Sequence, residues 1–374
     1  MTQNPRRTWG IWATAKEEDE MAPEANERQS EGNEERRQNG AALRNLDRSS
    51  DEANELQRSN RVRVMKFGGS VMASADNILL AARHVAEAAR NERIAVVVSA
   101  LRGVTDRLYS VTRALRLRDE QSALSEAQEI AQFHLHIARE LYSGDEQEFQ
   151  LRIELAELSL ELSTVVSGGT EGHSPAEVTD EVVSFGERWS SRLFAAALRR
   201  IGVNADALDA FHFIVTDGDR EDPHPKLAES YPKIHEALYG YLEAGTVPVV
   251  TGFVAATPEG RITTLGRNSS DFSAAIVACA LRAHDLTIWT SVDGFFDADP
   301  NHVPSAQQFE ELSYEEALEH SQRGARVVHP KAFDFLMQER IPLLVRNAAR
   351  PDAPGTWIGL REIGRQSAAS GGSR

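Results

Sequence analysis

Residues 61–99 read RVRVMKFGGSVMASADNILLAARHVAEAARNERIAVVVS, and this stretch decides the fold class. Val62–Phe67 is apolar and β-prone, Asp76–Asn91 carries apolar residues at helical spacing, and Ile94–Ser99 begins as an unbroken apolar run. Such a run is typical of a strand in a parallel sheet that helices cover on both faces. The stretch therefore predicts a strand, a helix and a second strand, the repeating unit of an α/β protein.

The alternation of strands and helices continues along the chain. We expect further strands at Val203–Leu208, Phe211–Thr216, Val247–Ala255, Arg261–Thr264, Leu286–Ser291 and Ile341–Arg346. We expect further helices at Val104–Leu117, Ser122–Tyr142, Glu148–Val165, Thr179–Ile201, Lys226–Glu243, Ser270–Arg282 and Tyr314–Ser321. This pattern predicts an α/β fold, a three-layer α/β/α sandwich with a mainly parallel central sheet.

The composition narrows the class of protein. The 374 residues include 57 acidic and 41 basic side chains, and the net charge of −16 disfavours a general nucleic-acid surface. Cys279 is the only cysteine, so an intrachain disulfide and a cysteine metal cluster are excluded, and a reducing cytoplasm fits. Because no apolar run approaches the roughly 18 residues of a membrane span, and we expect no secretory signal, the chain should be cytoplasmic, without nucleic acid or membrane as a partner.

The ends of the chain differ from its centre. Residues 1–60 hold 13 acidic and 9 basic side chains and few β-branched residues, so they have too little apolar surface to offset the entropy of ordering. We expect disordered tails at 1–60 and 361–374. Between the tails we expect two lobes, 61–245 with a helical insertion at about 118–166, and 246–360.

Glycines follow the first predicted strand, in Lys66-Phe67-Gly68-Gly69-Ser70. Glycines let backbone N–H groups approach phosphate oxygens closely, and a lysine supplies a point charge for them. The segment is not a Walker A loop, because its lysine precedes the glycines and no GKS or GKT ending follows. A plain strand-to-helix turn explains the glycines equally well.

A second polar segment, Thr264–Asp271 (TLGRNSSD), leads into an apolar helix. Small residues at a helix N-terminus suit an anion, Arg267 could hold a carboxylate bidentately, and Asp271 could orient a cation or a lysine. The alternative is that Ser270 or Asp271 is a simple N-cap.

A third segment, Trp289–Pro300 (WTSVDGFFDADP), places an acidic, glycine-containing loop at the end of a strand. Ligands of open α/β sheets bind at such strand ends. Asp-Gly and Asp-Pro also simply make turns, so this reading stays open too.

Seven segments match, in order, the motifs of one known family. These are KFGGS at Lys66–Ser70 (KFGGTS in the family), VVVSALRGVTD at Val96–Asp106 (VVVSAMGGVTN), SFGE at Ser184–Glu187 (S-x-G-E), GFVAATPEGRITTLGRNSSD at Gly252–Asp271 (GFIGATPDGRTTTLGRGGSD), TSVDGFFDADP at Thr290–Pro300 (TDVDGVYTADP), GARVVHP at Gly324–Pro330 (GAKVLHP) and VRNAARPDAPGTWI at Val345–Ile358 (VRNTFNPEAPGTLI). The chain from Arg61 to Ile358 thus resembles the catalytic domain of aspartate kinase, in the amino-acid kinase superfamily.

The resemblance implies the amino-acid kinase fold and transfer of the ATP γ-phosphoryl group to the β-carboxylate of L-aspartate, giving 4-phospho-L-aspartate. A carboxylate is ionised at neutral pH, so such a site requires no general base. It must instead align the reactants and neutralise like charges. Mg²⁺ would be carried mainly by the phosphates, with no protein ligand assigned, and the family's tendency to pair implies a homodimer.

The resemblance also implies a role for each matched residue. Lys66 would bridge phosphoryl charge, Asp271 would hold Lys66 or help to order Mg²⁺, Arg267 would grip the substrate α-carboxylate and Glu187 its ammonium. The substrate pocket would be completed by Ser99, Thr105 and Ser270. Phosphates would be cradled by Gly68, Gly69 and Ser70, and the nucleotide site would be lined by Thr290, Ser291, Phe296 and Arg326. We expect His329 to be structural, because no serine nucleophile pairs with it.

Several positions depart from the family motifs. Asn268-Ser269 replaces a glycine pair, Ser291 replaces an aspartate, Asn301 replaces an arginine of many members, and Arg326 replaces a lysine. The family usually continues beyond the position of Ile358 into two ACT regulatory modules. Only sixteen residues follow Ile358 in this sequence, too few for such a module. We therefore expect no ACT-mediated feedback inhibition by lysine, threonine or methionine.

Two alternatives remain beside aspartate kinase. One is another carboxylate or nucleotide kinase of the superfamily, acting for instance on glutamate or N-acetylglutamate. The other is a catalytically weak homologue that serves as a regulatory partner, which the motif departures motivate and the retained Lys66, Glu187, Arg267 and Asp271 oppose. The sequence leaves open whether the product enters lysine, threonine, methionine or ectoine synthesis.

Overall fold

The computed structural model describes residues 61–142, 146–168, 172–298, 303, 305–323 and 327–360. The tails expected at 1–60 and 361–374 lie outside these described residues. The departure at Asn301 and the nucleotide residue expected at Arg326 also lie outside them.

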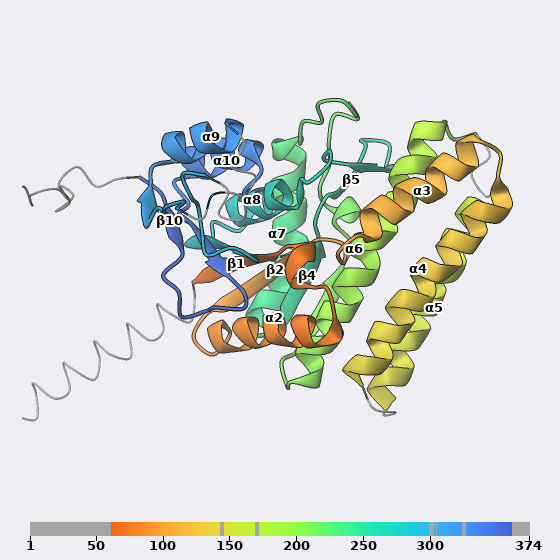
Figure 1. Ribbon diagram of the computed structural model, residues 1–374, viewed down its shortest axis with the longest axis horizontal. Helices are drawn as coiled ribbons and strands as arrows, with labels where there is room; N and C mark the ends of the chain where they lie inside the picture. The colour runs from red at the N-terminus through yellow and green to blue at the C-terminus, as the bar shows by residue number, and fades with distance from the viewer. Residues whose placement is uncertain are drawn as a thin grey trace, which may run out of the picture. The chain divides into compact units, whose positions relative to one another are not determined.

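The described part alternates strands and helices along the chain (Figure 1). Its strands are β1 (Val62–Phe67), β2 (Arg93–Val98), β3 (Ala205–Leu208), β4 (Val247–Thr251), β5 (Val254–Ala256), β6 (Ile262–Thr264), β7 (Asp285–Thr290), β8 (Glu311–Leu312), β9 (Leu343–Asn347) and β10 (Thr356–Ile358). Its α-helices are α2 (Ala75–Ala88), α3 (Val104–Arg116), α4 (Glu120–Leu141), α5 (Glu146–Val166), α6 (Pro175–Arg200), α7 (Leu227–Glu243), α8 (Ser270–Ala280), α9 (Tyr314–Gln322) and α10 (Pro330–Glu339). Short 3₁₀ helices are η1 (Gly69–Val71) and η2 (Ala210–His212).

Eight of these strands form one sheet in the order β3-β4-β2-β1-β7-β9-β10-β8. Each neighbouring pair is parallel except β9 with β10. Strand β1 is central, because it pairs with β2 on one side and β7 on the other. The segments that follow these three parallel strands therefore meet at one edge of the sheet, where α/β proteins bind ligands.

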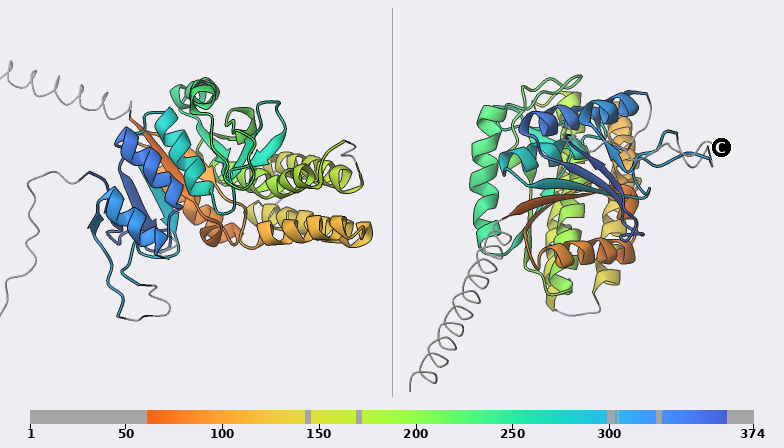
Figure 2. Two further views of the ribbon diagram at one scale, coloured as in Figure 1. Left: turned by 90° about the horizontal axis from the view of Figure 1, so that it is seen from above. Right: turned by 90° about the vertical axis from the view of Figure 1, so that its left-hand side faces the viewer.

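Alternate residues of the central strands enter two separate apolar cores. Met65 and Phe67 of β1 pack in a core with α2 to α6, whereas Val62 and Val64 pack in a core with α7 to α10. The sheet thus lies between two helical layers, which the views of Figure 2 show from two further directions. The predicted three-layer α/β arrangement with a mainly parallel sheet is confirmed.

Helix α6 is the central support of the first layer. It begins with a capping box at Ser174 and Glu177 and a proline at its first turn, signals that fix its start. Most of its side chains from Val182 to Leu198 are buried. Beyond it, the predicted helices α4 and α5 lie side by side (Figure 1).

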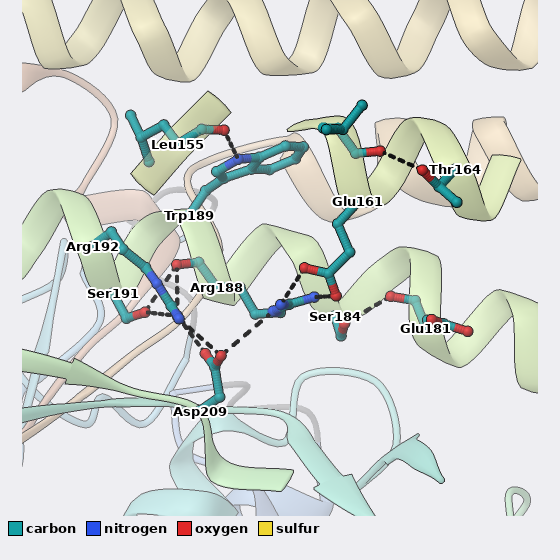
Figure 3. A network of polar contacts seen from close by, with 11 residues as sticks. Leu155, Glu161, Thr164, Glu181, Ser184, Arg188, Trp189, Ser191, Arg192 and Asp209 are labelled. Atoms are coloured by element: carbon teal, nitrogen blue, oxygen red, sulfur yellow. Dashed lines mark hydrogen bonds and ion pairs between the residues drawn. The ribbon is translucent and has the colours of Figure 1, made fainter. Parts of the chain in front are cut away.

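A charge network ties α6 to α5 and to the segment after β3 (Figure 3). The two terminal nitrogens of Arg188 donate to the two carboxylate oxygens of Glu161 at 2.9 and 2.7 Å. Arg188 Nε lies 3.5 Å from Asp209 Oδ2, which also accepts from Arg192 Nη2 at 2.9 Å. Because the side chains of Arg188 and Asp209 are each only 7% exposed, both charges need partners close by, which Glu161 supplies for Arg188 and Arg192 for Asp209.

Some sequence-based expectations were wrong in detail. The strand expected at Phe211–Thr216 is instead η2 followed by isolated bridges at Val215 and Thr216. The single strand expected at Val247–Ala255 is broken into β4 and β5 at Gly252-Phe253, where Phe253 has a φ of 65°. Helix α10 and the short strands β8 and β10 were not expected. None of the described helices combines the length and apolarity that a membrane span requires.

We predict that Asp209→Ala destabilises the fold by about 3–5 kcal/mol, because it removes the carboxylate that Arg192 binds in a largely buried site and leaves Arg188 with Glu161 alone. Thermal unfolding should show a melting temperature lower by roughly 10 °C. The matched control is Asp206→Ala, whose carboxylate is 55% exposed and lies 3.8 Å from Arg199. Equal melting temperatures for the two variants would contradict the structural role of the network.

Candidate active site

A cavity of about 730 Å³ opens at the edge of the sheet where β1, β2 and β7 end. Most of the site residues expected from the sequence line it: Lys66, Gly68, Gly69, Ser70, Ser99, Thr105, Glu187, Arg267, Ser270, Asp271 and Thr290. Ser291 and Phe296 do not line this cavity, although both lie on the segment that continues from β7. Parts of the chain more than 200 residues apart therefore contribute to one site.

A buried ion pair, formed by Lys66 and Asp271, lines the cavity. Lys66, on β1, places its Nζ 2.5 Å from Asp271 Oδ1, and the two side chains are only 10% and 9% exposed. The other oxygen, Asp271 Oδ2, accepts the backbone N–H of His329 at 3.1 Å. Asp271 lies in the first turn of α8, where the helix dipole favours a negative charge. Strand β1, helix α8 and the start of α10 are thus joined through one carboxylate.

The glycines after β1 permit a close approach of two loops. A Cβ on Gly69 would lie 2.5 Å from the carbonyl oxygen of Ala100, so only glycine fits there. A Cβ on Gly252, at the end of β4, would lie 2.8 Å from Ser270 Cβ. Close packing at these points brings the backbone after β1, the loop after β2 and the start of α8 around the same space.

Glu187 reaches the cavity from α6. Its side chain is buried, its Oε1 accepts the backbone N–H of Ala100 at 3.0 Å, and its Oε2 has no hydrogen-bond partner among the described residues. Burial raises the pKa of the Glu187 carboxyl to about 8, an effect that the nearby Lys66 charge only partly opposes. The cavity therefore holds a carboxyl group whose negative charge would be stabilised by a cationic ligand.

The loop before α8 accommodates the departures from the family motif. Gly266 and Asn268 both adopt left-handed backbone, with φ of 88° and 62°. Asparagine is among the residues that tolerate this conformation, so Asn268 retains the turn that a glycine would allow. Ser269 is fully buried, and Arg267 remains 60% exposed at the cavity.

The profile of the amino acid kinase family matches residues 61–347, more than half of the chain. This chain belongs to the amino acid kinase family. It is 36% identical over 313 residues to the chloroplastic bifunctional aspartokinase/homoserine dehydrogenase 1 of Arabidopsis thaliana, covering 82% of this chain and 33% of that protein. It is 31% identical over 298 residues to the aspartokinase of Rickettsia felis, covering 79% of this chain and 60% of that protein.

The fold of this amino acid kinase is similar to that of E. coli aspartokinase III, solved in complex with aspartate and ADP. The TM-score is 0.72 at 30% sequence identity, over 81% of this chain and 65% of that one. A structure of aspartokinase III with lysine and aspartate gives the same TM-score at 29% identity, over 81% and 66% of the two chains. The chain thus spans about a third of the length of the plant relative and about two thirds of these solved structures.

Part of the cavity wall consists of residues that were not expected from the sequence. The additional lining residues include Phe253, Ile288 and Trp289 on one side and Ser321, Val327 and Val328 on another. Phe253, Trp289, Val327 and Val328 lie in segments quoted above but, as apolar residues, gave no sign of lining a site, whereas Ile288 and Ser321 lie in none of those segments. His329 also lines the cavity. Its Nδ1 accepts the backbone N–H of Lys331 at 3.3 Å and its ring stacks on Phe272, which agrees with a structural histidine.

We predict that Glu187 makes stability depend on pH. Its pKa in the folded protein is about 8, above the ordinary 4.5. The protonated carboxyl therefore contributes its full share to the free energy of unfolding below pH 4.5, and this contribution is lost as the pH rises through about 8. Glu187→Gln should remove this dependence, which amounts to at most about 5 kcal/mol. Urea unfolding from pH 4.5 to 8.5 measures it, with Glu157→Gln on the exposed face of α5 as the control. Parallel wild-type and Glu187→Gln profiles would contradict the assignment.

Proposed function

We propose that this chain transfers the γ-phosphoryl group of ATP to the β-carboxylate of L-aspartate, giving 4-phospho-L-aspartate and ADP. The observation that carries the proposal is the meeting, in one cavity, of the buried Lys66–Asp271 pair, the glycines after β1, Glu187 and Arg267. A cation beside a glycine turn suits phosphate, whereas an arginine and a buried carboxyl suit the two charges of an amino acid. The resemblance to aspartokinases, one of them solved with aspartate and ADP, supports this substrate pair.

In the proposed reaction an oxygen of the β-carboxylate attacks the γ-phosphorus as the bond to ADP breaks. The carboxylate is already ionised at neutral pH, so no residue has to remove a proton from it. Lys66 stabilises the negative charge shared between the entering and leaving oxygens. Asp271 supplies the counter-charge of the buried ammonium and holds Lys66 in position, with Nζ 2.5 Å from Asp271 Oδ1.

The glycine turn and the metal have supporting roles in this proposal. Gly68, Gly69 and Ser70 cradle phosphate through their backbone. Among the described residues, no group of three or more His, Cys, Asp or Glu side chains could form a metal cage, and Asp271 is already engaged by Lys66 and by the backbone of His329. This donor set fits Mg²⁺ held mainly by the phosphates, where it would neutralise phosphate charge.

The substrate amino acid is proposed to bind by its charged groups. Arg267 takes the α-carboxylate, and Glu187 takes the ammonium, which supplies the counter-charge that its buried carboxyl needs. The remaining polar contacts to the amino acid are proposed to come from Ser99, Thr105 and Ser270. On this proposal, aspartate binding releases the proton of Glu187 below pH 8.

The nucleotide is proposed to extend from the glycine turn along the segment that follows β7. The residues proposed to contact it are Thr290, Ser291, Phe296 and Arg326. In this arrangement residues 61–245 mainly shape the amino-acid site and residues 246–360 mainly hold ATP, with Arg267 reaching across from the second part. Three further properties stay predictions. They are a homodimer, the use of the product in lysine, threonine, methionine or ectoine synthesis, and insensitivity to feedback inhibition.

A catalytically weak homologue is the second candidate, and Asn268 is the residue that would favour it. The left-handed backbone of Asn268 argues instead for an intact loop, because the substitution is made by a residue suited to that conformation. Lys66 and Asp271 also retain their ion pair. We therefore favour an active kinase.

The first test measures acyl phosphate formation and its dependence on Lys66. With ATP, Mg²⁺ and hydroxylamine, the wild-type protein should form aspartyl hydroxamate only when aspartate is present. Lys66→Ala should lower kcat by about 10²-fold or more, because a transition-state charge contact is lost. Lys226→Ala, which removes a lysine on the surface paired with Glu229, is the matched control. A folded Lys66→Ala protein with more than a tenth of wild-type kcat would refute the role of Lys66. If the wild-type protein formed a hydroxamate with glutamate and not with aspartate, glutamate would be the substrate.

The second test separates the two substrates. Arg267→Lys should raise the KM for aspartate at least about tenfold and leave the KM for ATP nearly unchanged, because an ammonium cannot reproduce the two-pronged grip of a guanidinium. Steady-state kinetics with each substrate varied in turn measures both values. Arg261→Lys, on a side chain that pairs with Glu177 away from the cavity lining, is the control. Similar increases for both substrates would place Arg267 at the phosphates.

A further inference from the structure

Two side chains of α3 contact the guanidinium of Arg267. Arg267 Nη2 donates to Asp106 Oδ1 at 2.7 Å, across a sequence separation of 161 residues. The central carbon of the same guanidinium lies 4.7 Å from the centre of the Tyr109 ring. Asp106 thus contacts one edge of the guanidinium, while the aromatic ring of Tyr109 supports its face.

These contacts restrain a side chain that is otherwise free to move. Arg267 is 60% exposed, and no hydrogen bond or ion pair joins it to any other described residue. A long exposed arginine has many rotamers, and fixing it costs conformational entropy. Contacts at both the edge and the face of the planar group select a few of these rotamers before any substrate arrives.

The geometry also leaves the guanidinium able to bind a second carboxylate. Asp106 engages it through one oxygen and one terminal nitrogen, whereas a guanidinium carries five N–H donors. Arg267 and Asp106 both line the cavity, whereas Tyr109 does not. Tyr109 therefore acts on a ligand in the cavity only through Arg267.

We propose that Asp106 and Tyr109 are positioning residues that hold Arg267 ready for the carboxylate of the amino-acid substrate. The proposal rests on the proposed function, in which Arg267 binds the α-carboxylate of aspartate. Because the ordering of Arg267 precedes binding, aspartate does not have to supply it. The benefit appears in the affinity for aspartate and leaves the affinity for ATP and the rate of phosphoryl transfer unchanged.

Asp106 has a second structural role that the test must separate. It lies in the first turn of α3, where a carboxylate also stabilises the helix through its dipole. Loss of that effect would lower stability without any selective change in the two KM values. The division between the KM for aspartate, the KM for ATP and kcat therefore distinguishes positioning from support of the helix.

The experiment compares Asp106→Asn, Tyr109→Leu and Tyr109→Phe with the wild-type protein in the hydroxamate assay. Asp106→Asn and Tyr109→Leu should each raise the KM for aspartate about threefold, the effect of losing an exposed ion pair or a cation–π contact to an exposed guanidinium. The KM for ATP and kcat should stay within about 1.5-fold of wild type on the same grounds. Tyr109→Phe keeps the ring and should retain the wild-type KM for aspartate. Glu120→Gln, an exposed carboxylate outside the cavity lining, is the charge-matched control.

Specific results would overturn the proposal. An unchanged KM for aspartate in both Asp106→Asn and Tyr109→Leu would remove the positioning role, and a lower KM in Asp106→Asn would show that Asp106 competes with the substrate. Equal values for Tyr109→Phe and Tyr109→Leu would exclude the ring contact. If Tyr109→Leu fails to fold, Asp106→Asn, a change of an exposed side chain, decides alone. Absence of hydroxamate with the wild-type protein would be a failure of the proposed function itself, whereas an active wild type with unaffected variants would be a failure of positioning only.

Discussion

The structure depends on one buried ion pair, between Lys66 and Asp271. A charge removed from water is tolerated only with a partner close by, and here each side chain is about nine-tenths buried. The pair joins the central strand β1 to the first turn of α8, and the second oxygen of Asp271 extends the connection to the backbone of His329. Three elements from distant parts of the chain are therefore fixed around a single point at the edge of the sheet.

The cavity combines this satisfied pair with a group that is left unsatisfied. Glu187 has one oxygen bonded to the backbone of Ala100 and another without a partner among the described residues. A protonated carboxyl is the form that such a burial favours while the cavity is empty. Burying this carboxyl oxygen without a partner costs free energy, and a cationic ligand beside it would lower that cost. Such unsatisfied groups are common in binding sites.

The parts of the fold that could be predicted are those where a short stretch of sequence strongly favours one secondary structure. The short, β-branched apolar run at Ile94–Val98 is typical of a strand covered on both faces, and it forms most of β2. Phe211–Thr216 has similar β-propensity, but its segment forms a single turn of 3₁₀ helix, because tertiary packing overrides short propensity signals. The break at Gly252 could not be foreseen, since it depends on the approach of Ser270, which is close only in the folded chain.

The same distinction holds for the site. Lys66 and the glycines were visible as a local motif, whereas Glu187 lies within a long helix whose sequence alone gives it no special role, and only the resemblance singled it out. Ile288 and Ser321 also line the cavity, but they lie in none of the motifs and carry no local signature. Chemistry concentrated in a short segment could be predicted from sequence, and shape assembled from many segments could not.

The network around Arg188 fixes the rotation of α6 about its own axis from outside the cavity. Arg188 follows Glu187 directly, so the two side chains project about 100° apart around the helix. Glu161 and Asp209 hold the guanidinium on the far side, and neither of them lines the cavity. Without that anchor, a rotation of α6 about its axis would carry Glu187 away from the backbone N–H of Ala100 and from the cavity. Helix α5, through Glu161, and the segment after β3, through Asp209, thereby help to keep Glu187 of α6 turned toward the cavity.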